Sequence, residues 1–333
     1  MQLITNMKDK MITLGHGSGA GKTKELINAV FNSNFKLPSL EDAVEIEHRL
    51  VTTTDAHVIR PLFFPGGDIG KLSISGTVND ISMKGAIPKY ILITFIIEEG
   101  FPISDLEKIA ESVQETAQIA GVRIIAGDTK VVEKGKADGV YITTTGIGQL
   151  PDGIDLKTGN IKSGDKILVN GTIGDHTIAI INARENLGLT PPPKSDCACL
   201  NELVQIMLQQ GEVKFIRDAT RGGVATILNE VYEETSLGIM LSDAKLPIKK
   251  EVNAVSELLG LDPLYMANEG KLVAFISGDT ESLLAKMKEH ELGKNTRIIG
   301  EVSADLKGVF SRTEIGSTRP LLMLDSDPLP RIC

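Results

Sequence analysis

The chain has 333 residues, of which 41% are hydrophobic and 24% charged, so it is long enough for two domains with a substantial core. A net charge of −9 and a pI near 5.2 argue against duplex nucleic acid as a partner, and aromatic residues at 4% with no Trp argue against base-stacking platforms. The longest apolar run, residues 90–97, is too short to cross a bilayer, and residues 1–14 lack the apolar core of a secretory signal. We therefore expect a cytoplasmic protein that binds neither nucleic acid nor membrane.

The first notable segment is a glycine cluster in residues 15–21, followed by a segment suited to a helix over residues 22–30. A P-loop of the pattern G-x-x-x-x-G-K-[ST] would end in Gly21, Lys22 and Thr23, but its first glycine is replaced by His16. We therefore predict a glycine flap that covers phosphates with backbone N–H groups, and a solvent-exposed loop is the alternative.

Strands and helices alternate through the rest of the first half. We predict strands over residues 50–60, 90–97, 122–130 and 139–148 from their alternating or β-branched patterns. Small residues permit a helix over 73–84, and a capping box of Ser104 and Glu107 predicts a helix that ends at Gly121. This order favours an α+β or mixed α/β layer over a purely parallel sheet.

Residues 149–165 consist of turn-forming residues and make the best domain boundary. The second half starts with a strand, a glycine turn and a helix, and continues with a helix near 200–208 and a strand over 213–218. Thr220 is predicted to cap the next helix, Gly260 to end a helix over 251–259, and residues 265–277 to form a loop and a strand before two short strands. We divide the chain into residues 1–155, 156–320 and a mobile tail, 321–333.

Four aspartates lie at strand ends or in glycine-rich turns: Asp55, Asp80, Asp128 and Asp218. Each one alone is more simply explained as a turn former or a helix cap. Together, converging carboxylates would repel one another unless a hard cation lay between them, and Mg²⁺ with phosphate oxygens is the common solution. With the glycine flap and Lys71, the pattern indicates Mg-ATP.

The tail carries the most unusual residue. Pro328 and Pro330 favour an extended arm over residues 325–333, and the arm ends in Cys333. This cysteine is either a chance residue on a frayed terminus or a tethered nucleophile that swings a covalently held group into a site. The other cysteines, Cys197 and Cys199, form no C-x-x-C pair and are predicted to be packed thiols.

Several motifs together resemble the HypE family of [NiFe]-hydrogenase maturation proteins in the PurM-like, or aminoimidazole-ribonucleotide synthetase-like, superfamily. They are HGSGAG, TTTDAHV, FFPGGDIGKLSISGTVNDISMKGAIP, AGDTKVV, RDATRGGVA, ANEGKLVAF and the terminal PRIC. The resemblance implies a two-domain α+β PurM-like fold, with an N-terminal sheet that forms a dimer interface, a C-terminal α/β sandwich and a flexible tail. It places an ATP site between the domains.

The resemblance also implies an activity. A carbamoyl group that the partner HypF places on the terminal cysteine is dehydrated to a thiocyanate at the expense of ATP, and the cyanide passes to a HypC–HypD complex. An alternative within the superfamily is an ATP-dependent kinase or synthetase that acts on a diffusible small substrate. A scaffold that docks on partners through its tail is the non-enzymatic alternative.

The resemblance assigns roles to particular residues. Cys333 carries the substrate and Glu269 accepts protons, with a simple turn residue as the alternative for Glu269. Lys130 is the charge partner or proton relay of Glu269, or alternatively a phosphate ligand. Magnesium is assigned to Asp55, Asp80, Asp128 and, less directly, Asp218. The nucleotide is assigned to Gly17, Gly19, Lys71, Asn79, Thr129 and Arg221. Asn79 is either a neutral oxygen ligand of the metal or a phosphate contact, and Arg221 either binds phosphate or pairs with Asp218.

Overall fold

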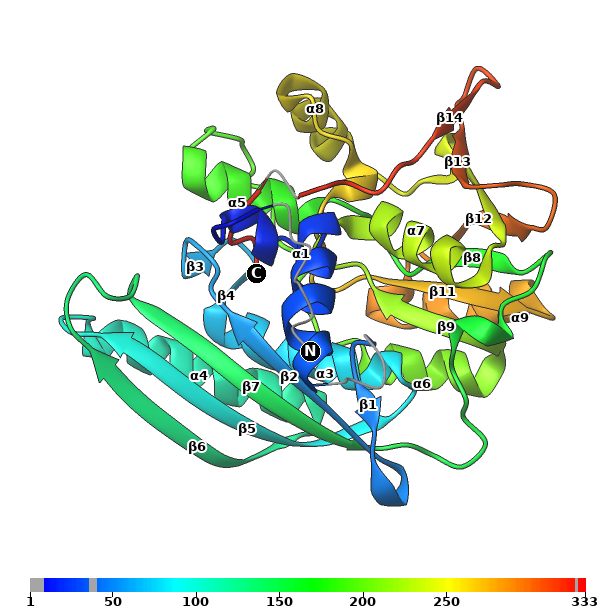
Figure 1. Ribbon diagram of the computed structural model, residues 1–333. Coiled ribbons are helices and arrows are strands. Elements are labelled where there is room, and N and C mark those ends of the chain that lie inside the picture. The colour runs from blue at the N-terminus through cyan, green and yellow to red at the C-terminus, as the bar shows by residue number, and fades with distance from the viewer. Residues whose placement is uncertain (1–8, 36–40, 327–328) are drawn as a thin grey trace.

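The computed structural model describes residues 9–35, 41–326 and 329–333. Two sheets form the framework, and α1 (Gly21–Leu26) and the C-terminus lie near the junction between them (Figure 1). Within the described residues, no helix is both long enough and apolar enough to span a bilayer.

The N-terminal sheet has five strands in the order β1-β2-β7-β5-β6. The bounds are Val44–Glu45, Leu50–His57, Val140–Gln149, Ile87–Glu98 and Arg123–Val132. In β7, buried and half-buried residues alternate regularly, because one face of the sheet packs on α3 (Ile69–Met83) and α4 (Ile103–Ala120). β5 and β6 are parallel, as expected for strands joined by the crossover helix α4.

The C-terminal sheet has seven strands in the order β14-β13-β10-β12-β8-β11-β9. The bounds are Thr318–Pro320, Val309–Arg312, Gly238–Ser242, Arg297–Ser303, Lys166–Val169, Leu272–Ser277 and Glu212–Asp218. Helix α7 (Gly223–Thr235) covers one face, while α6 (Asn201–Gln210) and α9 (Thr280–Glu289) cover the other. Burial on both faces explains why β8 and β11 are almost continuously apolar.

Two further helices, α5 (Asp175–Glu185) and α8 (Lys250–Leu259), pack against each other beside this sheet. The predicted terminal glycines end α4 and α8, since Gly121 and Gly260 both have positive φ. The predicted strands are all present, although β10 and the short strands β1 and β14 were not anticipated. The two-stranded sheet of β3 (Phe63–Phe64) and β4 (Gly67–Asp68) was not anticipated either.

Two predicted helix starts and one predicted helix cap were wrong. α3 begins at Ile69 rather than near residue 73, because the Asp68 carboxylate accepts hydrogen bonds from the N–H groups of Gly70 and Lys71 at 2.7 and 3.1 Å. α4 begins after Pro102, with no capping box at Ser104. α7 is preceded by Gly222 in the left-handed region, and Thr220 contributes only its backbone carbonyl to the turn.

After β14, residues 321–326 run without regular structure back towards α1, and residues 329–333 end between α5 and β2 (Figure 1). The predicted arm therefore lies on the protein in this structure, and it is not extended at its end, because residues 329–331 form a bend and turn in which Arg331 has φ +55°. Pro328 lies outside the described residues.

Candidate active site

A cavity of about 510 Å³ lies at the junction of the two sheets. β2 and α3 line it from the N-terminal half, while β9 and the loop before β11 line it from the C-terminal half. Six of the predicted functional side chains share it: Asp55, Asp80, Asp218, Arg221, Glu269 and Cys333. Gly19, a predicted flap contact, lines it as well.

Strand periodicity explains how β2 contributes to the cavity. Thr53, Asp55 and His57 are spaced by two residues, so their side chains point to the same face. Asp55 accepts a hydrogen bond from Thr77 Oγ1 at 2.6 Å, and Asp80 accepts one from Thr53 Oγ1 at 2.9 Å. These threonines orient both carboxylates without neutralising them.

The carboxylates perturb one another. Burial raises the pKa of Asp80 well above its usual range, and the charges of Asp55 and Asp218 raise it further. The pKa of Asp218 is also well above its usual range, first from burial and then from the charge of Asp42. The site therefore disfavours its own negative charge, which is what a cation site does before it is filled.

The described side chains of the acidic cavity supply only part of a metal site. Among the described residues, no group of three or more His, Cys, Asp or Glu side chains is arranged to hold an ion by itself. The donor set is nevertheless the oxygen-rich one that Mg²⁺ prefers, and this ion usually takes some of its ligands from water and phosphate.

Glu269 is only 3% exposed, and its Oε1 atom has no hydrogen-bond partner among the described residues. Burial raises the pKa of its carboxyl group well above the usual range, and the charges of Asp218 and Asp196 add to this effect, whereas Arg221 opposes it. A buried, unpaired carboxyl group with a raised pKa, in the same cavity as a thiol, is typical of a group that exchanges protons.

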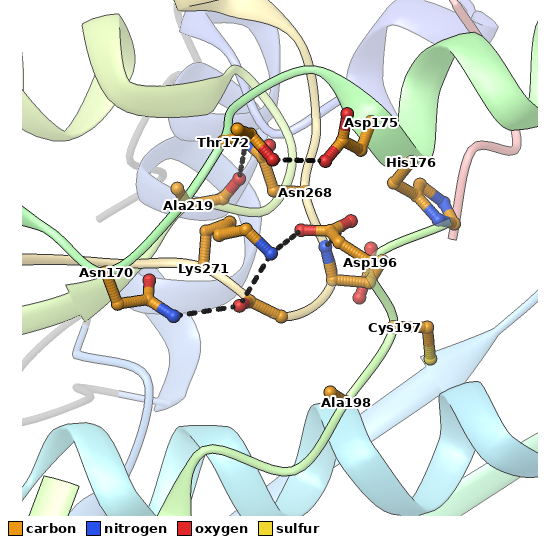
Figure 2. A network of polar contacts seen from close by, with 12 residues as sticks. Asn170, Thr172, Asp175, His176, Asp196, Cys197, Ala198, Ala219, Asn268 and Lys271 are labelled. Carbon is orange, nitrogen blue, oxygen red and sulfur yellow. Dashed lines mark hydrogen bonds and ion pairs between the residues drawn. The ribbon is translucent and has the colours of Figure 1, made fainter. Parts of the chain in front are cut away.

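A polar network that includes Asn170, Asp196 and Lys271 (Figure 2) fixes the main chain of Glu269. The Asp196 carboxylate accepts a hydrogen bond from the Glu269 N–H at 3.2 Å and forms an ion pair with Lys271 Nζ at 2.9 Å. Asn170 Nδ2 donates to the Gly270 carbonyl at 3.2 Å. The loop before β11 is therefore held at three consecutive residues.

The glycine flap differs from the prediction in one respect. The Gly21 and Lys22 N–H groups, which begin α1, donate to the carbonyls of Leu324 and Asp325 at 3.0 and 2.9 Å. Lys22 Nζ pairs with Asp9 at 2.8 Å. The tail thus occupies backbone donors that the sequence assigned to phosphate.

Several predicted site residues lie elsewhere in this single chain. Asp128, Thr129 and Lys130 are exposed on the edge strand β6, where Lys130 Nζ pairs with Asp128 at 2.5 Å. Lys71 Nζ donates to the Gly66 carbonyl at 2.9 Å, and Lys71 lines a different groove. The three β6 residues and Lys71 are absent from the described lining of the cavity.

Asn79 also has a different environment from the one expected. It is buried, and its side-chain amide is hydrogen-bonded to the backbone of Ala198 and Leu200 at 3.1 and 2.8 Å. In this structure the amide connects α3 to the segment before α6. Gly17 is not part of the described cavity lining, although its carbonyl accepts a hydrogen bond from Arg221 at 2.7 Å.

Sequence reasoning missed some residues of the cavity. Arg217 forms ion pairs with Asp42 at 3.1 Å and with Glu230 at 2.9 Å, and all three line the cavity together with His57. The period of two in β2 could have placed His57 beside Asp55. The Asp42–Arg217 pair had no comparable signal, because these residues come from distant parts of the chain.

Comparisons with known proteins agree with this architecture. The N-terminal domain model of the AIR synthase related proteins matches residues 40–150, and the C-terminal domain model matches residues 162–311. The fold and the cavity between the sheets thus define an AIR synthase related protein with the two-domain PurM-like α+β fold.

The more specific matches are to one group. Carbamoyl dehydratase HypE of Cupriavidus necator is 47% identical over 98% of this chain and 96% of its own length. A crystal structure of a HypE–HypF complex matches at 47% identity with a TM-score of 0.87, covering 90% of this chain and 99% of that chain. A crystal structure of HypE in complex with ATP matches at 38% identity with a TM-score of 0.83, covering 97% and 100%. The chain therefore belongs to the HypE family of carbamoyl dehydratases.

Proposed function

We propose that the protein uses ATP to dehydrate an S-carbamoyl group on its own Cys333 to a thiocyanate, which supplies the cyanide ligand of [NiFe]-hydrogenase. The observation that carries this proposal is the position of Cys333 in one cavity with Glu269, Arg221 and four aspartates. HypF is the proposed carbamoyl donor, and a HypC–HypD complex is the proposed cyanide acceptor. The three cysteines are thiols rather than disulfides, which suits a reducing, cytoplasmic location.

The reaction needs an activated oxygen, because an amide oxygen is a poor leaving group. The carbamoyl oxygen attacks the γ-phosphorus of ATP and ADP leaves, so the oxygen becomes part of a phosphate ester. Loss of the two N–H protons and cleavage of the C–O bond then release phosphate and leave S–C≡N. The oxygen of the amide ends in phosphate, and the sum corresponds to loss of one water from the thiocarbamate.

Glu269 is the proposed proton acceptor. Burial raises its pKa, so its carboxylate form is a strong base. The positive charge of Arg221 favours this ionised form. The tail supplies proximity, because its substrate is covalently attached and needs no separate binding step.

The cavity also suits the nucleotide. Asp55, Asp80 and Asp218 would hold Mg²⁺ together with phosphate oxygens, and the ion would neutralise charge on the transferred phosphoryl group. Gly19 and Arg221 are the proposed nucleotide contacts from the flap and from the turn after β9.

Asp128, Thr129 and Lys130 are proposed to act across a homodimer. Their strand, β6, is the edge of the N-terminal sheet, and its apolar residues Ile125 and Val131 are 52% and 67% exposed. Exposed apolar side chains on an edge strand are typical of a surface that another chain covers. A dimer through the N-terminal sheets would carry these residues to the partner's cavity.

Intact-mass measurement tests the activity. Carbamoylated protein given Mg-ATP is expected to lose the mass of one water, Cys333→Ser is expected never to acquire the carbamoyl group, and Glu269→Gln is expected to bind ATP without losing water. Water loss in the absence of ATP would contradict the mechanism. Full activity after deletion of residues 321–333 would instead favour a kinase with a diffusible substrate.

Mixed dimers test the site across the interface. A dimer of one Lys130→Ala chain and one Glu269→Gln chain contains one complete site if Lys130 acts in the partner's cavity, and none if it acts in its own. Activity of the purified mixed dimer is the expected result, with the two homodimers as inactive controls. An inactive mixed dimer would exclude the proposed arrangement.

A further inference from the structure

The last residues of the tail are held through their main chain. The N–H of Val58 donates to a main-chain oxygen of Cys333 at 3.3 Å, and the N–H of Arg60 donates to the Arg331 carbonyl at 3.4 Å. Between them, Ile332 is only 2% exposed and belongs to the N-terminal core. The tail therefore pairs with the segment that follows β2, and this pairing fixes its register.

Helix α5 contributes a buried histidine to the same segment. His176 Nε2 lies 2.7 Å from the Ile332 carbonyl, and Nδ1 lies 2.7 Å from Ser195 Oγ. A carbonyl can only accept, so Nε2 carries the proton and Nδ1 accepts a hydrogen bond from the Ser195 hydroxyl. Ser195 Oγ in turn accepts from the Cys197 N–H at 3.1 Å. This chain of hydrogen bonds holds the imidazole in one tautomer.

The same helix contributes an arginine two turns later. Arg184 Nη1 donates to the Pro330 carbonyl at 2.8 Å, and Nη2 donates to the Arg331 carbonyl. Its Nε atom donates to the Arg60 carbonyl at 2.5 Å, on the segment that pairs with the tail. The planar guanidinium thus joins both partners of the pairing.

His176 and Arg184 together contact three consecutive carbonyls, those of residues 330, 331 and 332. These oxygens do not change when Cys333 Sγ carries a carbamoyl or cyano group. The arrangement can therefore dock the tail in each chemical state of the thiol. Neither residue belongs to the described lining of the cavity, so we treat neither as touching the reacting atoms.

We propose that His176 and Arg184 are positioning residues that dock the tail by its backbone carbonyls, in the register that places Cys333 in the acidic cavity. The consequence for catalysis rests on the proposed function, whereas the docking itself does not. Helix α5 is then the element on which the inward position of the tail depends.

Alkylation of the thiols by N-ethylmaleimide, followed on separate peptides by mass spectrometry, tests the docking. Arg184→Gln and His176→Leu are each expected to raise the alkylation rate of Cys333 about tenfold, because each loses hydrogen bonds that hold the docked state. Cys197 is buried and serves as an internal standard, since its reactivity should not change while the fold is intact. Arg312→Gln, on β13 near the far edge of the C-terminal sheet, is the matched control.

Conservative variants separate docking from folding. His176→Gln keeps a donor for the Ile332 carbonyl and is expected to retain much of the protection, whereas Arg184→Lys offers one ammonium in place of the fork and should lose it. If Cys197 becomes reactive in Arg184→Gln or His176→Leu, the fold is disturbed there, and the conservative variants Arg184→Lys and His176→Gln provide the test of docking. Unchanged alkylation of Cys333 in Arg184→Lys, or equal exposure in His176→Gln and His176→Leu, would overturn the proposal.

A second readout connects docking with chemistry. In carbamoylated Arg184→Gln, water loss in a single turnover is expected to slow about tenfold, while ATP affinity and carbamoylation by HypF stay unchanged. If the wild-type protein lost no water at all, the proposed function would fail while the alkylation result could still stand. If water loss were unaffected in a variant whose Cys333 alkylates rapidly, docking by α5 would not serve catalysis.

Discussion

The guanidinium of Arg221 donates a hydrogen bond to the backbone carbonyl of Gly17 at 2.7 Å, which ties the turn after β9 to the glycine flap. Two residues further on, Gly19 has φ +78° and lies so close to Arg221 that an added Cβ would stand 2.7 Å from the Arg221 Cβ. Gly19 therefore needs to be glycine for two reasons, its backbone conformation and the close approach of the arginine. Gly17 has open space around the corresponding position.

This contrast predicts different effects of two alanine substitutions. Gly19→Ala is expected to weaken ATP binding about tenfold, because a strained left-handed alanine and its contact with Arg221 together cost about 1–2 kcal/mol in the closed flap. Gly17→Ala, the matched control, should bind ATP like the wild type. Titration calorimetry with a non-hydrolysable ATP analogue measures both. Equal affinities of the two variants would show that the flap does not close over the nucleotide.

The carboxylates of the cavity predict that removing the charge of Asp80 raises stability but impairs function. The folded-state pKa of Asp80 lies well above the ordinary value of 3.8, so as the pH rises from 3.8 towards that raised pKa the unfolded chain releases a proton that the folded chain keeps, and stability falls. Asp80→Asn should therefore stabilise the protein without nucleotide by at least about 1 kcal/mol at pH 8, and by much less at pH 4. The same variant should lose Mg-dependent ATP binding.

Thermal unfolding at the two pH values measures this effect, and Asp152→Asn in an exposed turn is the control. Asn retains an oxygen that can accept the hydrogen bond from Thr53, so the loss of charge is the main change. An unfolding midpoint at pH 8 that is no higher than that of the wild type would contradict the prediction.

The sequence predicts correctly the helices and strands in which buried residues recur at a regular spacing. β7 alternates because only one of its faces is covered, and α4 ends at Gly121 because glycine readily adopts the left-handed conformation there. The starts of α3 and α4 and the cap of α7 were wrong because several nearby residues could cap each helix. Which of these candidate residues caps the helix depends on the parts of the chain that pack around it in the folded protein.

The same limit applies to the site. Reasoning from strand ends and glycine turns brought Asp55, Asp80 and Asp218 into one cavity, as the structure does. Asn79 is adjacent to Asp80, but successive residues of a helix point about 100° apart, so its amide reaches a different segment. Asp128 lies on the edge strand β6, and the sequence of one chain does not show whether a second chain packs against that edge.

His57 predicts a measurable pH dependence of stability. The side chain is 6% exposed and lies 3.2 Å from Thr144 Oγ1, and burial lowers its pKa to about 4 although the charge of Asp55 opposes this. Between the folded value and the unfolded value of 6.5, the unfolded chain binds a proton that the folded chain does not, so stability falls as the pH falls through this window. The maximal contribution is about 3 kcal/mol.

Urea unfolding of wild type and His57→Gln at several pH values isolates this contribution from the carboxylates, which remain in both proteins. The wild type should lose up to about 3 kcal/mol more than the variant between pH 7 and pH 4. The same experiment with the exposed His48→Gln should give parallel curves. Parallel curves for His57→Gln would mean that the buried imidazole takes up a proton in the folded state.

The Lys271–Asp196 ion pair predicts the largest loss of stability. Both side chains are nearly inaccessible, and the pKa of Asp196 is lowered because the charge of Lys271, together with its other partners, overcomes the opposing effect of burial. Lys271→Met should cost about 3–5 kcal/mol, since it leaves a buried carboxylate unpaired, whereas adding Asp196→Asn should recover much of this. Lys286→Met, in the exposed pair with Glu289, should cost less than about 1 kcal/mol.

The same ion pair, shown in Figure 2, should also affect catalysis, because Asp196 fixes the main chain of Glu269 through a hydrogen bond from its N–H. In the double variant, whose stability is partly restored, the amide introduced by Asp196→Asn is uncharged but can still accept from the Glu269 N–H, so water loss should recover together with stability. Urea unfolding and single-turnover mass measurement follow the two quantities. A double variant as unstable as Lys271→Met would show that the ion pair itself, rather than an unpaired charge, determines the stability of the loop before β11.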